Sequence, residues 1–271
     1  MKDEHGNFIT DTKKIALHFM EFFKRILNNM GDKIITYEKR IYYTAEPEIL
    51  KPTLNKVKTI INTLKNNKAP GDDNINSELI KLVNKQLITK IHKLIYNVRT
   101  KEKVLTDWNI AIICPIFKKG DPTEVENYQG ISLVDTSYKD LSLTILKRLE
   151  KYATDIIGKY QSGFIRGKST TNHIFTIRQI MEKYYEYDKE LHMVFVDFKQ
   201  VYDTINRDHS WIALTNLGIP NKLIKIIKIC NSNTFCKVQW QGELSPHFEI
   251  KSGLKQGDAH FHILFNLLLN N

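Results

Sequence analysis

The sequence predicts an α+β fold, in which amphipathic helices pack on a small antiparallel sheet. Apolar residues recur at helical spacing in several stretches, the first of them at residues 12–28. Short runs rich in β-branched and aromatic residues, bounded by turn residues, predict strands at 108–117, 193–196 and 235–240. At 271 residues the chain can bury a real core and can form one large or two modest domains.

Charge and cysteine content narrow the class of protein. The 40 Lys and Arg residues against 30 Asp and Glu give a net charge of +10, which favours a polyanionic partner such as nucleic acid. A solvated basic surface would explain the same charge, and charge alone does not separate the two. Three cysteines without a C-x-x-C pair argue against a disulfide framework and a structural zinc site.

The distribution of apolar residues bears on localisation. The first residues are polar and lead into no apolar signal segment, and the longest apolar runs are far too short to cross a membrane. We therefore expect an intracellular protein of the nucleus or cytoplasm that is not secreted and has no membrane partner. The sequence does not predict an oligomeric state.

The N-terminal part predicts two helices joined by a connector. Asp11 can cap a helix at 12–28, whose aromatic face must be buried against another element. A polar connector follows at 32–51, and a short helix then begins near Thr53.

Residues 69–75 contain a Pro-Gly pair and predict a tight turn, after which a helix is expected from 78 to about 100. The adjacent Asp72 and Asp73 resemble paired metal ligands. They suit turn chemistry better, because no strand leads into them.

A hairpin and a basic helix come next. The strand at 108–117 runs into a tip that carries Lys118 and Lys119, and the chain returns through 127–134. These lysines could bind phosphate groups or could simply be solvated. A basic amphipathic helix is expected at 137–154.

Residues 161–171 form a loop with two glycines, two cations and several hydroxyl groups. Such a loop suits contact with a nucleic-acid strand, although it lacks the spacing of a Walker P-loop. A helix at 172–187 then leads to the predicted strand at 193–196. Asp197 follows this strand, where a sheet can present a carboxylate to a ligand. An aspartate between a strand and a helix also suits an N-cap, and the capping preference alone favours that interpretation.

The C-terminal part predicts helices at 204–217 and 222–230, two short antiparallel strands at 235–240 and 247–250, a turn at 253–258 and an apolar helix at 263–269.

Six short strings, taken in order, resemble the reverse transcriptase domain of non-LTR (LINE-type) retrotransposons over roughly residues 60–270. The strings are Lys68-Ala69-Pro70-Gly71, Pro115-Ile116-Phe117-Lys118-Lys119-Gly120-Asp121, Asn127-Tyr128-Gln129-Gly130-Ile131-Ser132, Tyr160-Gln161-Ser162-Gly163-Phe164, Phe195-Val196-Asp197-Phe198-Lys199 with Tyr202-Asp203, and Gly253-Leu254-Lys255-Gln256-Gly257-Asp258. The resemblance implies a right-hand polymerase fold without a thumb. Residues 1–52 would be an N-terminal helix and linker from an endonuclease connector, 53–190 the fingers, and 191–271 a partial palm.

The same resemblance implies an enzyme that copies an RNA template onto a DNA primer from dNTPs, with two Mg²⁺ ions at the reacting phosphate. It makes Asp197 the first metal carboxylate and the main-chain carbonyl of Phe198 a further ligand. It places the ring of Tyr202 against the sugar of the nucleotide. Ordinary core packing is the alternative role for this tyrosine.

The resemblance also assigns residues that contact nucleotide and nucleic acid. Lys118 and Gln129 fall where the family binds the triphosphate. At the position of Gln129 relatives usually carry an arginine. Gln129 therefore replaces a bidentate phosphate ligand with a neutral amide, and nucleotide affinity should fall. Gln256 and Gly257 match the turn that packs against the template and the incoming base pair.

We expect the nucleic-acid strand itself to contact the cations near these strings, namely Lys119, Arg166 and Lys168.

Two departures from the family pattern affect the predicted activity. His260-x-His262 stands where relatives have another sequence; it looks like a metal site, but no further ligands are identifiable nearby, and sequence drift explains it better. The family's second catalytic string, an aromatic residue followed by x-Asp-Asp, is expected beyond 263–269, and the sequence ends before it. We therefore expect an RNA-directed DNA polymerase domain that is inactive as this polypeptide. The alternative is a non-catalytic remnant that binds nucleic acid through phosphate contacts.

Overall fold

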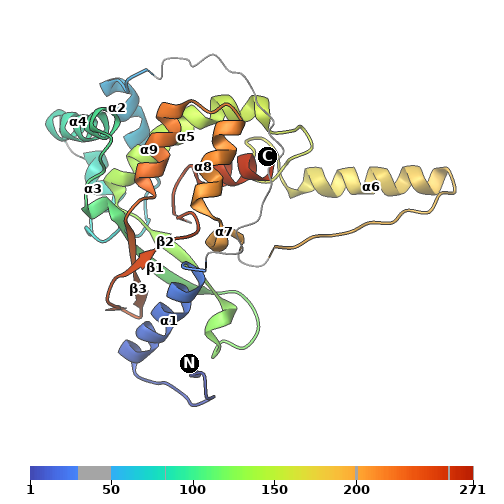
Figure 1. Cartoon of the computed structure of the whole chain (residues 1–271), viewed down its shortest axis with the longest axis horizontal. Coiled ribbons are helices and arrows are strands. Elements are labelled where there is room, and N and C mark those ends of the chain that lie inside the picture. The colour runs from blue at the N-terminus through green and yellow to red at the C-terminus, as the bar shows by residue number, and fades with distance from the viewer. Residues whose placement is uncertain (30–49, 83, 199–200, 256, 271) are drawn as a thin grey trace.

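The fold is a mixed α+β arrangement with a small sheet and packed helices, as the sequence predicts (Figure 1). A computed structural model describes residues 1–29, 50–82, 84–198, 201–255 and 257–270. The helices of this part are α1 (Thr12–Ile26), α2 (Leu54–Thr63), α3 (Ser77–Leu82), α4 (Lys85–Lys101), α5 (Thr136–Ile156), α6 (Thr170–Glu186), α7 (Val201–Thr204), α8 (Arg207–Asn216), α9 (Asn221–Cys230) and α10 (Phe261–Leu269). The strands are β1 (Ile110–Phe117), β2 (Tyr128–Leu133), β3 (Thr234–Trp240), β4 (Glu243–Leu244) and β5 (Phe248–Ile250).

The sheet has the order β2-β1-β3-β4, and β5 pairs with the other end of β3. β1 and β2 form the predicted antiparallel hairpin, in a register that pairs Phe117 with Tyr128. β3 pairs antiparallel with β4 and β5. The β1–β3 pair is parallel, so the sheet is mixed, and the prediction of a purely antiparallel sheet is wrong at this pair.

Helix α1 covers one part of the sheet with its aromatic residues. Asp11 caps the helix as expected, since its carboxylate accepts a hydrogen bond of 2.8 Å from the backbone N–H of Lys14. The ring centroid of Phe19 lies 4.9 Å from that of Trp240. A Cβ on Gly130 in β2 would come within 2.9 Å of the Phe23 ring, so the glycine lets α1 approach the strand closely.

Helix α5 is the centre of the helical layer. Its Tyr138 and Leu149 are fully buried, and α2 and α10 pack against it. The helix predicted at 78–100 proves to be two helices. The first ends at Leu82, and Asn84 caps α4, because its side chain accepts a hydrogen bond from the backbone N–H of Leu87.

Helix α6 projects from the rest of the molecule, and the chain after it returns beside it (Figure 1). No residue of α6 is buried. The strand predicted at 193–196 is wrong: residues 189–198 have no regular structure, and Val194 and Val196 are 88% and 72% exposed. A β-branched run forms a strand only when a neighbouring strand pairs with its backbone, and no described strand lies beside this one.

None of the described helices is both long enough and apolar enough to cross a membrane. We call residues 170–198 the arm, and the rest of the described chain the body.

Candidate nucleotide and nucleic-acid site

The tip of the β1–β2 hairpin presents two lysines to solvent. The backbone N–H of Lys118 donates a hydrogen bond of 3.0 Å to the carbonyl of Asn127, which closes the hairpin directly beyond the last strand pair. Gly120 makes the turn possible with a φ of +93°. The side chains of Lys118 and Lys119 are exposed, so both ammonium groups can reach a phosphate.

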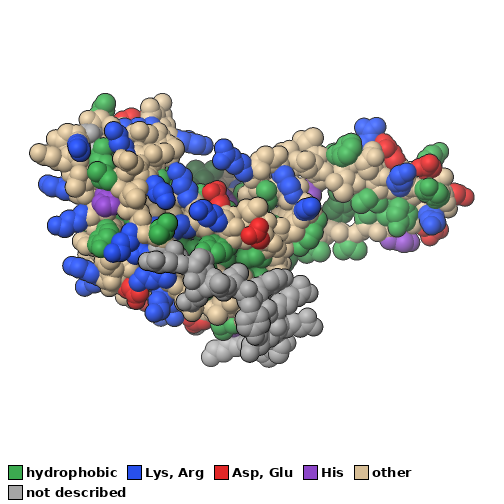
Figure 2. Space-filling model, turned by 90° about the horizontal axis from the view of Figure 1, so that it is seen from above, with side chains coloured by type: hydrophobic (Ala, Val, Ile, Leu, Met, Phe, Trp, Pro, Cys, Tyr) green, Lys and Arg blue, Asp and Glu red, His purple; other side chains and the backbone are tan. Residues whose placement is uncertain are grey.

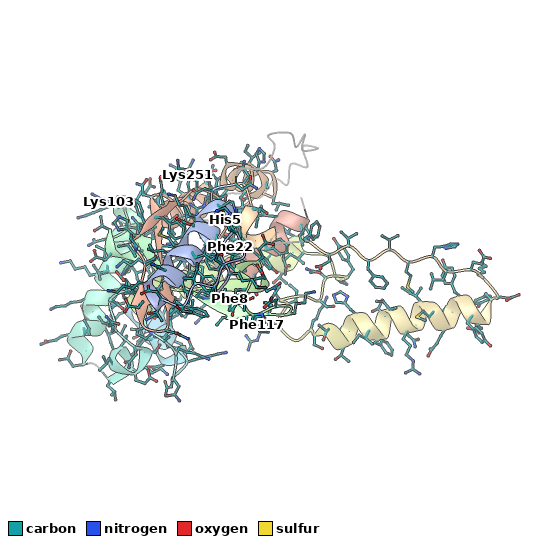
Figure 3. All side chains as sticks on the ribbon, turned by 90° about the horizontal axis from the view of Figure 1, so that it is seen from below. His5, Phe8, Phe22, Lys103, Phe117 and Lys251 are labelled. Carbon is teal, nitrogen blue, oxygen red and sulfur yellow. The ribbon has the colours of Figure 1, made fainter. Side chains whose placement is uncertain are left out.

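Asp121, at the same tip, binds the N-terminal segment instead of a ligand. Its carboxylate lies 2.8 Å from the Lys2 ammonium, and the Lys2 backbone N–H donates to the carbonyl of Thr123. Hydrogen bonds from the side chains of Lys2 and Thr123 hold the pKa of Asp121 well below its usual value. Figure 3 shows Phe8 of this segment on the same face as Phe117 at the end of β1.

Gln129 lies in β2 opposite Ile116, on the hairpin that carries Lys118. Its side chain is half-buried and makes contacts within the protein. Its predicted position near the triphosphate depends on a bound nucleotide and stays a prediction.

The turn at 253–258 packs directly on β2 and on the end of α7. A Cβ on Gly257 would collide with the backbone carbonyl of Ser132. Gly253 has a φ of +73°, and a Cβ there would lie 2.6 Å from the carbonyl oxygen of Asp203. The backbone N–H of Leu254 donates a hydrogen bond of 3.1 Å to the carbonyl of Tyr202. The 253–258 turn therefore packs against the string in β2 and against the Tyr202–Asp203 stretch. Gln256 lies outside the described residues.

Tyr202 packs against α10. Its ring centroid lies 4.8 Å from that of Phe261 and 4.6 Å from that of Phe265. Burial raises the pKa of the Tyr202 phenol. The ring therefore has a structural role beside the turn, which was the alternative left open by the sequence. Its role against a nucleotide sugar stays a prediction.

The loop at 161–169 is attached to α10 by side chains. Gln161 donates a hydrogen bond of 2.8 Å to the side-chain oxygen of Asn266, and Asn266 donates one of 2.8 Å to the carbonyl of Gly163. The Phe164 ring stacks on His262 with centroids 4.1 Å apart. The loop and the helix after the 253–258 turn are thus one packed unit.

The two cations of this loop differ in their surroundings. Lys168 donates to the carbonyl of Gln161 at 2.7 Å and to that of Lys159, so its ammonium closes the loop. Arg166 is exposed. Contact of either residue with nucleic acid is not tested by this geometry.

A buried polar cluster beneath the turn was missed by the sequence analysis. The Tyr138 hydroxyl donates a hydrogen bond of 3.0 Å to Asp258, and the Lys255 ammonium lies 4.9 Å above the Tyr138 ring. His260 is within hydrogen-bond distance, 3.0 Å, of the Ser142 hydroxyl. Asp258 and Lys255 stand inside the glycine-rich string, which was the only available signal, but their partners on α5 are more than 100 residues away in sequence.

Burial keeps two side chains of this cluster uncharged. Burial lowers the pKa of His260 and raises that of Tyr138 well above its usual value, so both are neutral at pH 7. A neutral His260 can accept a hydrogen bond from Ser142, whose oxygen in turn accepts one from the backbone N–H of Ala259. His262 contacts Phe164 instead, so the two histidines have separate packing partners.

The Asp72–Asp73 pair is used within the body, as a turn would require. Asp72 forms a salt bridge of 2.8 Å with Lys237 of β3. The backbone N–H of Asp73 donates to the carboxylate of Asp135 at the start of α5, and a Cβ on Gly71 would collide with the same aspartate. Burial and the charge of Asp73 raise the pKa of Asp135 to about 6.

Asp197 and Phe198 lie at the end of the arm and are both exposed. Mg²⁺ takes an octahedral set of oxygens, commonly from more than one carboxylate. In the described ranges, no group of three or more His, Cys, Asp or Glu side chains could hold a metal ion. The described residues therefore do not fit the two-metal site that the resemblance implies.

With this geometry established, comparison with known proteins identifies the family. A sequence profile described as "Reverse transcriptase (RNA-dependent DNA polymerase)" matches residues 116–271, more than half of the chain. The chain belongs to the reverse transcriptase family. The match covers the hairpin tip and β2, the 161–169 loop, the arm and the 253–258 turn.

Several curated relatives support the assignment. Over 81% of its own length, the chain is 26% identical to the RNA-directed DNA polymerase from mobile element jockey of Drosophila melanogaster. It is 25% identical to the retrovirus-related Pol polyprotein from type-1 retrotransposable element R2 of Popillia japonica over 74%, and 21% identical to the transposon TX1 uncharacterized 149 kDa protein of Xenopus laevis over 76%. The aligned parts span only 24%, 28% and 16% of these proteins. The resemblance to non-LTR reverse transcriptase domains is confirmed.

Proposed function

We propose that this chain forms the nucleotide- and template-facing part of an RNA-directed DNA polymerase that uses an RNA template, a DNA primer and dNTPs. The observation that carries the proposal is the meeting of the hairpin, the Tyr202–Asp203 stretch and the 253–258 turn. Ser132 and Gly257 are in contact although they lie 125 positions apart in the sequence. The hairpin is then part of the fingers, and the turn part of the palm.

In this arrangement Lys118 binds the triphosphate as a point charge, because it follows the last strand pair directly and is exposed. Gln129 on the same hairpin supplies a neutral amide, which gives weaker phosphate binding than an arginine would. Gly257 keeps the turn close to β2, so that turn and hairpin form one continuous surface for the base pair.

We further propose that this polypeptide alone does not extend a primer. Asp197 is exposed at the end of the arm, and no group of three or more His, Cys, Asp or Glu side chains among the described residues could hold a metal ion. A single carboxylate does not fix two metal ions at a reacting phosphate. Catalysis requires Asp197 to dock beside further carboxylates that the described residues do not bring to it.

The test is binding and extension on one template–primer. Purified chain is mixed with an RNA template annealed to a labelled DNA primer, with and without the next complementary dNTP. We expect the dNTP to slow dissociation of the hybrid several-fold, and Lys118→Ala to abolish this effect. Lys13→Ala, at an exposed lysine of α1, is the matched control and should retain it.

Primer extension is followed in the same reactions. We expect none, and extension that Asp197→Asn abolishes would contradict the claim that the chain is inactive by itself. A dNTP effect that Lys118→Ala leaves intact would contradict the assignment of the hairpin.

A second candidate function is nucleic-acid binding without nucleotide recognition. The net charge of +10 favours it, and Figure 2 shows Lys and Arg side chains gathered over the body, whereas hydrophobic side chains are prominent along the arm. Under this alternative the hybrid binds, with an affinity that falls steeply with salt, but dissociates equally fast with and without dNTP.

A further inference from the structure

A cavity lies between α2 and α5, at the opposite end of the body from α1 (Figure 1). Its volume is about 770 Å³, within the range of sites that bind small molecules. Its walls are mainly apolar, and they include Leu50, Pro52, Val57, Ile60 and Tyr152. The polymerase proposal assigns no role to this cavity.

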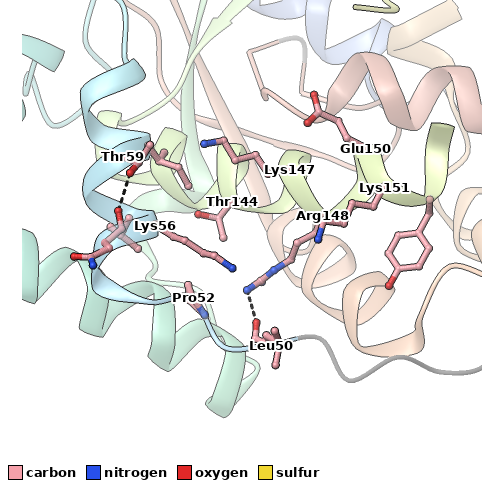
Figure 4. A pocket seen from close by; sticks show the side chains of 13 residues that line it. Leu50, Pro52, Lys56, Thr59, Thr144, Lys147, Arg148, Glu150 and Lys151 are labelled. Carbon is pink, nitrogen blue, oxygen red and sulfur yellow. Dashed lines mark hydrogen bonds between the residues drawn. The ribbon is translucent and has the colours of Figure 1, made fainter.

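Four cations and a single carboxylate, Glu150, surround the apolar walls. Lys56 extends from α2, and three more cations come from α5 (Figure 4). These three are Lys147, Arg148 and Lys151. None of the three lysines forms a salt bridge with another described residue. Within the part of the chain that the structure describes, the positive charge around the cavity is therefore largely uncompensated.

Arg148 is held in place at the cavity wall. Its guanidinium donates a hydrogen bond of 2.6 Å to the carbonyl of Leu50. Burial, together with the nearby charge of Arg99, lowers the pKa of Arg148. An anion in the cavity would stabilise the charged guanidinium and so offset the effects of burial and of Arg99 on the pKa of Arg148.

The hydroxyl groups of both threonines in the cavity wall already form hydrogen bonds within the protein. Thr59 donates to the carbonyl of Asn55 at 2.9 Å, and Thr144 donates to that of Asp140 at 2.8 Å. A ligand is thus recognised by negative charge at the rim and by an apolar, flat group inside. An acidic peptide fits less well, because its backbone N–H and C=O groups would find few partners on these walls.

We propose that the cavity binds an unpaired nucleotide of a single-stranded RNA, with the base against the apolar walls and the flanking phosphates on Lys56, Lys147 and Lys151. Lys147 and Lys151 are four residues apart on α5, a rise of about 6 Å, so they can contact neighbouring backbone phosphates. Unpaired bases splayed into apolar or aromatic sites are a common mode of RNA recognition. The proposal deepens the proposed function by adding a second RNA contact; it rests on nucleic acid as the partner but requires no polymerisation.

The test measures binding of a fluorescent single-stranded oligouridylate to the whole chain by anisotropy, over a series of salt concentrations. The double variant Lys147→Ala/Lys151→Ala is compared with Lys13→Ala/Lys14→Ala, which removes the same charge from exposed positions of α1. We expect the α5 variant to bind roughly ten-fold more weakly and to lose about 1.4 units of slope in log affinity against log salt, two single-strand phosphate contacts. The α1 variant should change little.

Two further probes locate the base. An abasic oligomer of equal length should bind the wild-type chain several-fold more weakly than oligouridylate, but bind the α5 variant nearly as well as oligouridylate does. Oligomers containing 4-thiouridine should crosslink to the peptide that contains Tyr152.

Equal loss of affinity in the α1 and α5 variants, or crosslinks confined to other peptides, would overturn the inference. So would a polyglutamate of equal charge that competes as well as the RNA does. Loss of the dNTP effect at the hairpin would leave these results unchanged, so failure of the proposed function and failure of this inference are distinguishable.

Discussion

The body and the arm both carry family strings, yet only the body holds its strings in place by packing. The 253–258 turn packs on β2, where Gly257 leaves no room for a Cβ beside Ser132. Asp258 accepts a hydrogen bond from Tyr138 of α5, and the backbone N–H of Leu254 donates one to the carbonyl of Tyr202 in α7. The arm holds Asp197 on a segment whose neighbours Val194 and Val196 are exposed. A string therefore gains a defined geometry from the elements that pack on it, as the 253–258 turn does and the exposed Asp197 segment does not.

The largest effect should come from filling the space at Gly257. Gly257→Ala places a methyl group where the Ser132 carbonyl lies, and β2 cannot move away because β1 pairs with its far edge. We expect a loss of about 3 kcal/mol in the free energy of unfolding, measured by urea denaturation.

Gly163→Ala is the matched control, because the nearest atom to its Cβ would be 3.7 Å away. Its cost should stay below about 1 kcal/mol. Similar costs for the two variants would mean that the turn is not packed on β2.

A smaller effect, dependent on pH, is expected at Asp140 of α5. The residue is fully buried, neither carboxylate oxygen has a hydrogen-bond partner among the described residues, and desolvation raises its pKa to about 7. The folded state therefore binds a proton that the unfolded state, with a pKa near 3.8, releases. The stability from this group is present below about pH 4 and is lost as pH rises through 7.

Asp140→Asn should accordingly be more stable than the wild type at pH 8, by roughly 2 kcal/mol, and should show a flatter dependence of unfolding free energy on pH. Asp155→Asn, at an exposed position of the same helix, should leave the slope unchanged. Asp135, whose pKa is also raised, contributes to the slope that remains. An unaltered slope in Asp140→Asn would show that this carboxylate is solvated.

The smallest effect should be in the arm. Val194→Ser and Val196→Ser remove apolar atoms that are already exposed, so each should change the free energy of unfolding by less than about 0.5 kcal/mol. Val238→Ala, at a fully buried position of β3, should cost about 2 kcal/mol. A cost in the arm comparable with that in β3 would mean that the 193–196 segment is packed in solution.

Local signals predicted much of the body. The hairpin follows from its β-branched run and turn residues, and α1, α2, α5 and α9 begin within two residues of the predicted positions. Asn84 was missed as a helix boundary because the apolar spacing continues across it. The parallel pairing of β1 with β3 was not predictable, since strands more than 100 residues apart give no sequence signal of their register.

The sequence likewise predicted only part of the candidate site. The strings identified the turn and the hairpin, but the contact of Tyr138 with Asp258 and that of Ser142 with His260 depend on how α5 packs under the turn. The strand expected before Asp197 was wrong because its apolar run needs a partner strand, which local sequence does not specify.

Amide hydrogen exchange of the whole chain tests the central claim most directly. We predict that the amides of 193–197 exchange at the rate of an unstructured peptide, while those of β1 and β3 are protected by at least about 10³-fold, because only the latter are hydrogen-bonded in a sheet. Equal protection of 193–197 and β3 would contradict the account, since it would place Asp197 on a formed strand.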